Sequence, residues 1–221
     1  MRETLFLFQH FWRADIRAKH GVSGLVLFAV ATVYATYQIA GGHPGPEVWN
    51  AMAWVILLFT SFNGVSRSLE EDRPEVLSYL RTTVRPLHYV MARTMHNVVV
   101  LGGLACMLLA FFGLLMGWSE LEGWRLWGFL AAMVSTAIAL GTMLTLLALI
   151  AARAGGGFGM TAVLGLPLVL PIVLVCTNLG QALLQGHLLS DTWHHFMFLG
   201  ALTVGSGVLG GVLFPYLWRA T

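Results

Sequence analysis

Long apolar stretches separated by short polar breaks run through most of the chain. Their approximate positions are 22–40, 48–65, 91–117, 127–152, 160–184 and 197–218. Each is close to the roughly 20 residues that a helix needs to cross the hydrocarbon core of a bilayer. No run alternates apolar and polar residues as a membrane barrel strand does, so the spans are expected to be helices. The pattern predicts an all-α integral membrane protein in which six transmembrane helices form one domain over 1–221.

The first 20 residues predict a different kind of helix. One face carries apolar residues at spacings of three and four, namely Leu5, Phe8, Trp12 and Ile16. Arginine and lysine residues cover the other side of this helix. A helix with this pattern lies in the plane of the membrane interface, so 1–20 is predicted to be an interfacial amphipathic helix. A solvated tail is the alternative, and the neighbouring aromatic residues disfavour it.

The composition agrees with a membrane protein. Hydrophobic residues make up 57% of the chain and charged residues only 10%, which is too little polar surface to cover a water-facing domain. The two cysteines, Cys106 and Cys176, both fall inside apolar spans. They are interpreted as small buried hydrophobic residues, because neither belongs to a Cys-x-x-Cys pair.

The basic residues are unevenly divided between the two sides that six spans create. Of the 12 Lys and Arg residues, all but Arg125 fall on the side of the N-terminus. Because Lys and Arg concentrate in cytoplasmic loops, both termini are expected in the cytoplasm. Orientation in the lipid bilayer also accounts for these residues, so nucleic acid is not an expected partner.

The segment 67–90 is predicted to be a cytoplasmic coupling segment. The slightly longer run 67–93 carries five of the 12 basic residues and four of the 10 acidic ones. Pro74 suits the first position of a helix, acids surround this start, and Pro86 is expected to end the helix before the third span. A short coupling helix is therefore expected here.

This short helix has the composition of a docking element. A helix laid into a groove of a soluble partner is a common recognition mode, with acids facing basic residues and apolar side chains filling a pocket. A solvated helix resting on lipid headgroups is the alternative. The candidate docking residues are Glu70, Glu71, Asp72, Glu75, Leu77, Tyr79, Leu80, Arg81 and Arg85.

Catalytic chemistry is not expected from this chain. It has no phosphate-binding Gly-x-x-x-x-Gly-Lys-Ser/Thr loop, and its single lysine is Lys19. No Ser-His-Asp set, metal cluster or pair of acids suggests a catalytic or metal site. No Asp, Glu or Lys lies in the middle of a span, which disfavours an ion-driven carrier or an intramembrane protease. Any nucleotide must therefore be bound by another chain.

Two spans carry features that suggest motion or close packing. Pro167 and Pro171 lie one turn apart in the fifth span and predict a kink, which is either static or a hinge. Gly207 and Gly211 suit close helix contact, within the chain or with a second copy in a homodimer. Mild polar residues in the spans are expected to cross-link helices, and lining a transport path is the alternative: Asn63, Asn97, Thr142, Thr145, Thr177, Asn178 and Gln181.

Short motifs follow one another in a characteristic order over most of the chain. They are Phe62-Asn63-Gly64-Val65-Ser66-Arg67-Ser68, the acidic run 70–72, Tyr79-Leu80, Arg85-Pro86, and the runs 91–97 and 166–172. Their order, together with six spans and a basic N-terminal helix, resembles the ABC-2-type permeases. More narrowly, it resembles the haem exporter protein B (CcmB) family of cytochrome c maturation.

The resemblance implies a permease subunit of an ABC transporter complex in the bacterial inner membrane. An ABC ATPase subunit would hold ATP and dock on 67–90. A haem-handling membrane protein and a periplasmic haem chaperone would be further partners, and haem would be the substrate, with no cofactor assigned to this chain. ATP hydrolysis by the ATPase subunit would drive haem export or release of the chaperone.

Two other functions remain open from the sequence. One is an ABC-2 permease for a lipid, a polysaccharide or a drug, and the other is a non-transporting scaffold that anchors an ATPase. Four histidines on the outer side, His43, His187, His194 and His195, are interpreted as solvated side chains, with haem ligation as the alternative.

Overall fold

The computed structural model describes residues 2–18, 21–42, 44–70, 84–117, 121, 123–153 and 158–219. Seven α-helices account for nearly all of this part of the chain. They are α1 (Arg2–Ala18), α2 (Gly21–Ile39), α3 (Pro46–Glu70), α5 (Pro86–Met116), α6 (Trp124–Arg153), α7 (Phe158–Leu184) and α8 (Leu189–Arg219). The prediction of an all-α protein is confirmed.

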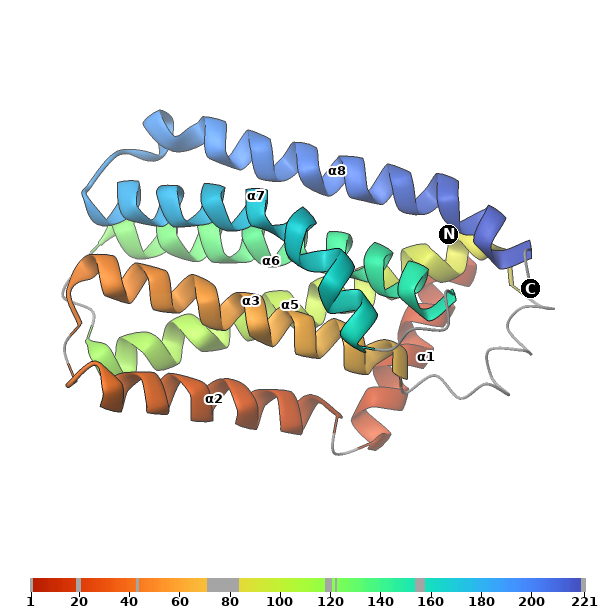
Figure 1. Ribbon diagram of the computed structural model, residues 1–221, viewed down its shortest axis with the longest axis horizontal. Coiled ribbons are helices and arrows are strands. Elements are labelled where there is room, and N and C mark those ends of the chain that lie inside the picture. The colour runs from red at the N-terminus through yellow and green to blue at the C-terminus, as the bar shows by residue number, and fades with distance from the viewer. Residues whose placement is uncertain are drawn as a thin grey trace.

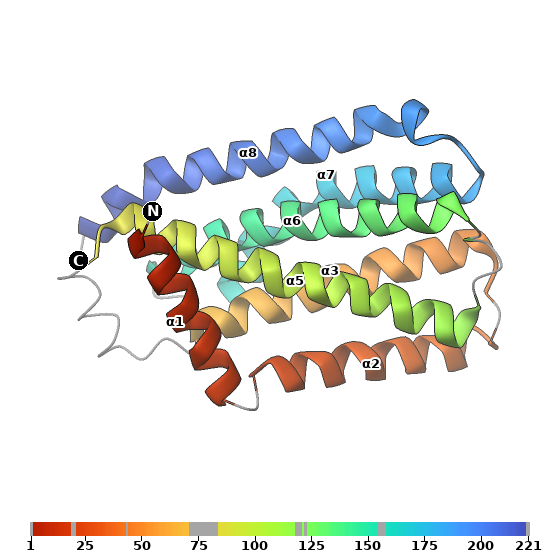
Figure 2. The same cartoon turned by 180° about the vertical axis from the view of Figure 1, so that it is seen from behind.

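Five of these helices, α3 and α5 to α8, are long and apolar enough to cross a membrane. The remaining apolar helix, α2, is shorter, with its apolar part at Ser23–Ile39. It nevertheless lies alongside α3 and α5 in the same bundle (Figures 1 and 2). The chain is therefore a multi-pass membrane protein. That α2 forms a sixth span stays a prediction.

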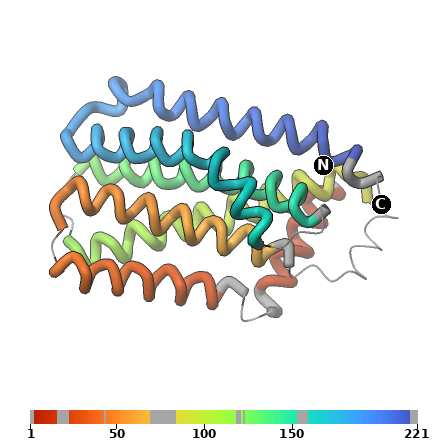
Figure 3. The backbone as a smooth tube through the Cα atoms, viewed as in Figure 1, coloured from red at the N-terminus to blue at the C-terminus, as the bar shows by residue number. Residues whose placement is uncertain are grey.

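The six apolar helices run side by side and alternate in direction along the chain (Figures 1 and 3). The shorter α1 crosses one end of this bundle at a steep angle and packs on α5 (Figure 2). We call this the α1 end. There α3 and α8 finish and α5 begins, whereas α3, α6 and α8 begin at the opposite end.

The centre of the bundle is α6, which packs against α3, α5, α7 and α8. Small residues allow this, as a Cβ added to Gly141 would lie 3.1 Å from Val98 Cγ2 on α5. Buried aromatic rings fill the space near the opposite end, where Trp49 meets Phe112 and Phe129 edge to face at 5.4 and 5.1 Å. By contrast, α8 lies at the edge and leaves most of its surface exposed.

The helices around the coupling segment are longer than predicted. α3 continues to Glu70 and α5 begins at Pro86, where the sequence predicted ends near 65 and 91. Pro86 takes the first helical position of α5, and Arg85 before it is extended (φ −68°, ψ 136°). Proline fits the first turn of a helix without losing a hydrogen bond. The coupling helix that was expected to end before Pro86 lies outside the described residues.

The last helix also begins earlier than predicted. The connection expected at 185–196 is only 185–188, with Gly186 at a φ of 89°, and α8 starts at Leu189. Asp191 in the first turn of α8 complements the positive end of the helix dipole. His194 and His195 therefore lie on α8, and the prediction that they sit in the loop was wrong.

The predicted kink in the fifth span is present. α7 contains both Pro167 and Pro171, and it changes direction along its length (Figure 1). We call residues 158–166 the inner limb and residues 172–184 the outer limb. Each proline lacks the N–H that the helix would use, which accounts for the bend. The hinge function of these prolines stays a prediction.

The glycine pair on α8 makes little contact within the described chain. A Cβ added to Gly211 would lie 3.4 Å from Leu87 Cδ1, an ordinary packing distance. At Gly207 the same atom would meet none of the described residues within 4 Å. Close packing through both glycines is therefore absent among the described helices, and packing against a second copy stays a prediction.

Candidate coupling site at the α1 end

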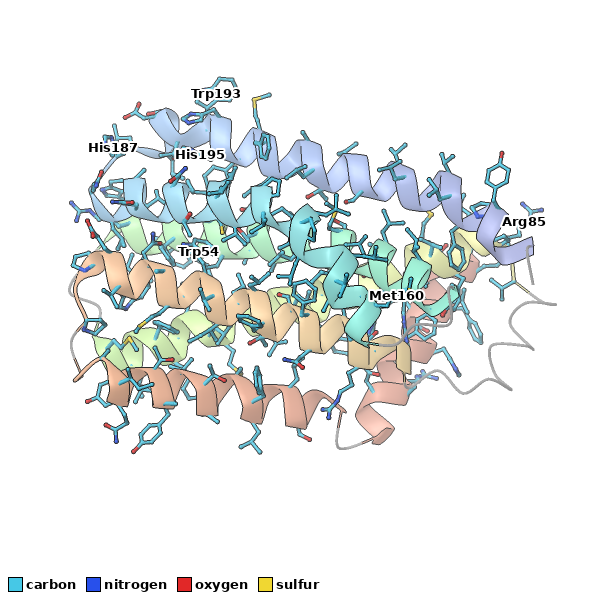
Figure 4. All side chains as sticks on the ribbon, viewed as in Figure 1. Trp54, Arg85, Met160, His187, Trp193 and His195 are labelled. Carbon is cyan, nitrogen blue, oxygen red and sulfur yellow. The ribbon has the colours of Figure 1, made fainter. Side chains whose placement is uncertain are left out.

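Two of the predicted docking residues, Glu70 and Arg85, lie at the α1 end of the bundle. Glu70 is the last residue of α3, and Arg85 is exposed just before α5. Figure 4 places Arg85 at this end, far from His187 and Trp193 at the opposite end. The other candidates, Glu71, Asp72, Glu75, Leu77, Tyr79, Leu80 and Arg81, lie outside the described residues.

A buried asparagine joins three helices close to the end of α3. The Ser68 hydroxyl on α3 donates to Asn97 Oδ1 on α5 at 2.7 Å. Asn97 Nδ2 then donates to Thr145 Oγ1 on α6 at 2.9 Å. Because buried polar groups are costly without partners, these bonds fix α3, α5 and α6 relative to one another. The prediction that Asn97 and Thr145 cross-link helices is confirmed.

A buried histidine on α5 receives α1. His96 is only 1% exposed, and its Nε2 lies 3.0 Å from Asp15 Oδ2 on α1. Three aromatic rings of α1 surround the imidazole edge to face at 6.1–6.3 Å, namely those of Phe8, Phe11 and Trp12. The carboxylate lies at ion-pair distance and the rings enclose the imidazole, although neither imidazole nitrogen makes a well-aligned hydrogen bond within the described chain.

Two further contacts hold the remainder of α1. The guanidinium carbon of Arg93, itself buried, lies 4.6 Å from the centre of the Phe11 ring. Nearer the start of α1, Glu3 Oε2 lies 3.4 Å from His88 Nδ1. α1 thus presents carboxylates and an aromatic face to a row of basic side chains on α5.

The apolar face of α1 that meets the bundle differs from the predicted face. Leu7 and Phe11 are buried in a cluster with Tyr89 and Phe214, whereas Leu5 and Trp12 are exposed. The helix therefore has two apolar surfaces. One packs against α5. On the other, Leu5 and Trp12 are exposed and can meet lipid, as an interfacial helix requires, although the Phe8 and Trp12 rings also contact His96.

A small cavity of about 30 Å³ lies between these polar side chains. Its volume suits a single water molecule with several polar partners. Arg67 closes one side and reaches α2, since a Cβ added to Gly24 would lie 2.6 Å from the Arg67 guanidinium nitrogen Nη1. The polar lining consists of Asp15, Arg67, Ser68, His96 and Asn97. We call these five residues the coupling cluster.

Sequence reasoning did not assign Asp15, Arg93 or His96 to a site. A signal was nevertheless present, because Arg93, His96 and Asn97 fall on one face of an otherwise apolar helix at spacings of three and four. Asp15 is the only acid in the second half of α1. Counting the charges of each span separately could not show that residues of α1 and α5 meet.

Three of the four outer histidines, His187, His194 and His195, lie at the opposite end, and His43 lies outside the described residues. The His194 and His195 rings lie 4.0 Å apart, and His187 and Trp193 are exposed near them (Figure 4). Within the described ranges, no group of three His, Cys, Asp or Glu side chains is placed to hold a metal ion.

Comparison with protein families gives one match over nearly the whole chain. The family model described as CcmB protein matches residues 2–218, which include the coupling cluster and both limbs of α7. No curated protein matches the chain.

Proposed function

Because the chain belongs to the CcmB protein family of haem export in cytochrome c maturation, we propose that it is the permease subunit of an ABC transporter complex. A separate subunit would hydrolyse ATP, and the energy would drive haem export or the release of a haem-loaded chaperone. The family match across 2–218 carries this proposal. The five long apolar helices support it.

The ATPase subunit would dock on the segment between Glu70 and Pro86. A displacement there would reach α3 and α5 directly, because both helices are continuous with the segment's two ends. Ser68 and Asn97 would carry it to α6, while His96 and Asp15 would carry it to α1. The coupling cluster thus supplies a contiguous mechanical connection of the kind that coupling requires.

In the membrane, α2 would supply the sixth span, and both termini would be cytoplasmic in the bacterial inner membrane. Leu5 and Trp12 of α1 would enter the lipid interface, since both are exposed. A haem-handling membrane protein and a periplasmic haem chaperone would complete the complex.

Charge reversal at the docking site is expected to release the ATPase subunit. With Glu70, Glu71 and Asp72 all changed to Lys, basic residues of the partner would meet like charges, so its recovery with the tagged permease should fall at least about tenfold. Co-purification in detergent measures this. The matched control changes Glu47 and Asp191 to Lys at the opposite end, where recovery should stay unchanged. Full recovery with the triple variant would show that the ATPase docks elsewhere.

Vesicles containing the permease, its ATPase and its haem-handling partner test transport itself. ATP should produce haem movement or release of haem-loaded chaperone, followed by haem absorbance. A complex that retains the ATPase but does neither would be a scaffold, and the transport proposal would then be wrong.

A further inference from the structure

α3 touches α7 on both sides of its two prolines. On the inner limb, a Cβ added to Gly165 would lie 2.8 Å from Phe62 Cε1 of α3. On the outer limb, a Cβ added to Gly180 would lie 2.7 Å from Trp54 Nε1 of α3. The absence of side chains at these two glycines lets α3 approach both limbs closely.

The two contacts differ in chemistry. The contact at Gly165 is an aromatic ring against backbone, which imposes no direction. At the outer limb, Trp54 Nε1 donates to Asn50 Oδ1 at 2.6 Å, and Asn50 Nδ2 donates to the Thr177 carbonyl at 2.9 Å. Hydrogen bonds are directional and weaken steeply when misaligned, so this contact resists sliding.

The two α3 side chains of the hydrogen-bonded contact are buried, while Thr177 on α7 is half-buried. Asn50 is 4% exposed and Trp54 2% exposed, and Figure 4 shows Trp54 inside the bundle. An amide buried in a membrane bundle has no water to replace a lost partner, so Asn50 is held to its two bonds.

The geometry points to Asn50 as a positioning residue that makes α3 and the outer limb of α7 move as one unit. This inference rests on the proposed function, in which the ATPase displaces α3 at the α1 end. The displacement then reaches the outer limb through Asn50 and Thr177. α7 bends at Pro167 and Pro171, which absorbs the difference in movement between its two limbs.

The consequence falls on a pocket at the opposite end. A cavity of about 490 Å³ lies between the first turn of α3 and the last turns of α7, lined in part by Glu47, Gln181 and Gln185. Asn50 lies one turn closer to the α1 end than Glu47 on α3, and Thr177 lies one turn closer to the α1 end than Gln181 on α7. The Asn50 contact therefore sets the distance between the α3 wall and the α7 wall of this pocket. This distance stays constant when α3 and the outer limb of α7 move together.

The test compares two asparagines of α3 in the complete complex with its ATPase. Asn50→Ala removes the bridge to α7. Asn63→Ala is the matched control, because Asn63 Nδ2 bonds only to the Phe59 carbonyl of its own helix in the described chain. Trp54→Phe, which keeps the ring but removes the donor, provides a second variant should Asn50→Ala fold poorly.

Spin labels report the separation of the two helices. They are placed at the exposed positions Val55 on α3 and Leu174 on α7, with Cys106 and Cys176 changed to Ser. In the parent protein and Asn63→Ala, the distance distribution should stay narrow during ATP turnover. In Asn50→Ala it should broaden, and Trp54→Phe should broaden it less.

Measurements of ATP hydrolysis and haem delivery distinguish a positioning role of Asn50 from a role in stability alone. Asn50→Ala should keep ATP hydrolysis within about twofold of the parent but lower haem delivery at least about tenfold, a loss of about 1.4 kcal/mol in coupling. Unchanged distances and haem delivery in both Asn50→Ala and Trp54→Phe would overturn the inference. If the parent complex delivers no haem, the proposed function fails, and the label distances without nucleotide still decide whether Asn50 holds the two helices together.

Discussion

Gly180→Val is expected to lower the free energy of unfolding by about 2–5 kcal/mol. Its side chain would overlap Asn50 Oδ1 and crowd Trp54 Nε1, so α3 and α7 must separate. Overpacking a filled site costs about 1–3 kcal/mol, and each buried polar group left without a partner costs about 1–3 kcal/mol more. Thermal unfolding in detergent should show Tm lower by about 5–15 °C.

The matched control is Gly103→Val on α5. Gly103 is exposed in mid-helix, and an added Cβ there would meet none of the described residues within 4 Å. It shares the helix-propensity effect of valine but lacks the clash, so its Tm should change by less than about 3 °C. Equal shifts in the two variants would mean that α3 does not approach Gly180 closely.

Asp15→Leu is expected to detach α1 from the bundle. It leaves His96, 1% exposed, without the carboxylate 3.0 Å away, at a cost of about 1–3 kcal/mol. His96→Leu combined with Asp15→Leu should recover part of this loss, because neither polar group is then buried alone. The coupling energy from the double-mutant cycle should be about 0.5–3 kcal/mol, measured by thermal unfolding.

Detachment of α1 can be followed separately from global unfolding. A cysteine at Leu7, 3% exposed, should react with a maleimide much faster in the Asp15→Leu background than in the parent, once Cys106 and Cys176 are changed to Ser. Glu3→Leu serves as the control, because Glu3 and His88 are more exposed and such pairs contribute less than about 1 kcal/mol. Equal labelling rates for Leu7→Cys in all backgrounds would show that Asp15 does not hold α1.

Hydropathy predicted the helices because a membrane span needs about 20 apolar residues wherever it lies in the fold. It could not predict which spans are central. α6 and α8 are both strongly apolar, yet α6 is mostly buried and α8 mostly exposed. Lipid and protein interior favour the same side chains, so composition does not distinguish the two environments.

The site was harder to predict than the fold for a related reason. Asp15 and His96, like Asn50 and Thr177, lie far apart in sequence and meet only after the helices pack. The local pattern assigned α1 a lipid-facing surface, and Leu5 and Trp12 of this surface are exposed, but the pattern did not reveal that Leu7 and Phe11 pack inward. The periodicity of a sequence describes the faces of one helix at a time, whereas each of these polar contacts joins two helices.

α2 is the shortest of the six apolar helices of the bundle. At about 1.5 Å per residue its 19 residues reach about 28 Å, close to the roughly 30 Å hydrocarbon thickness of a typical bilayer, whereas the 25 residues of α3 reach about 38 Å. As the proposed sixth span, α2 would therefore have the least length to spare across the bilayer, on the side of the bundle that α1 also contacts. Acyl chain length would then be a mechanical variable for this protein, because a thicker membrane would strain the corner at which α1 is anchored.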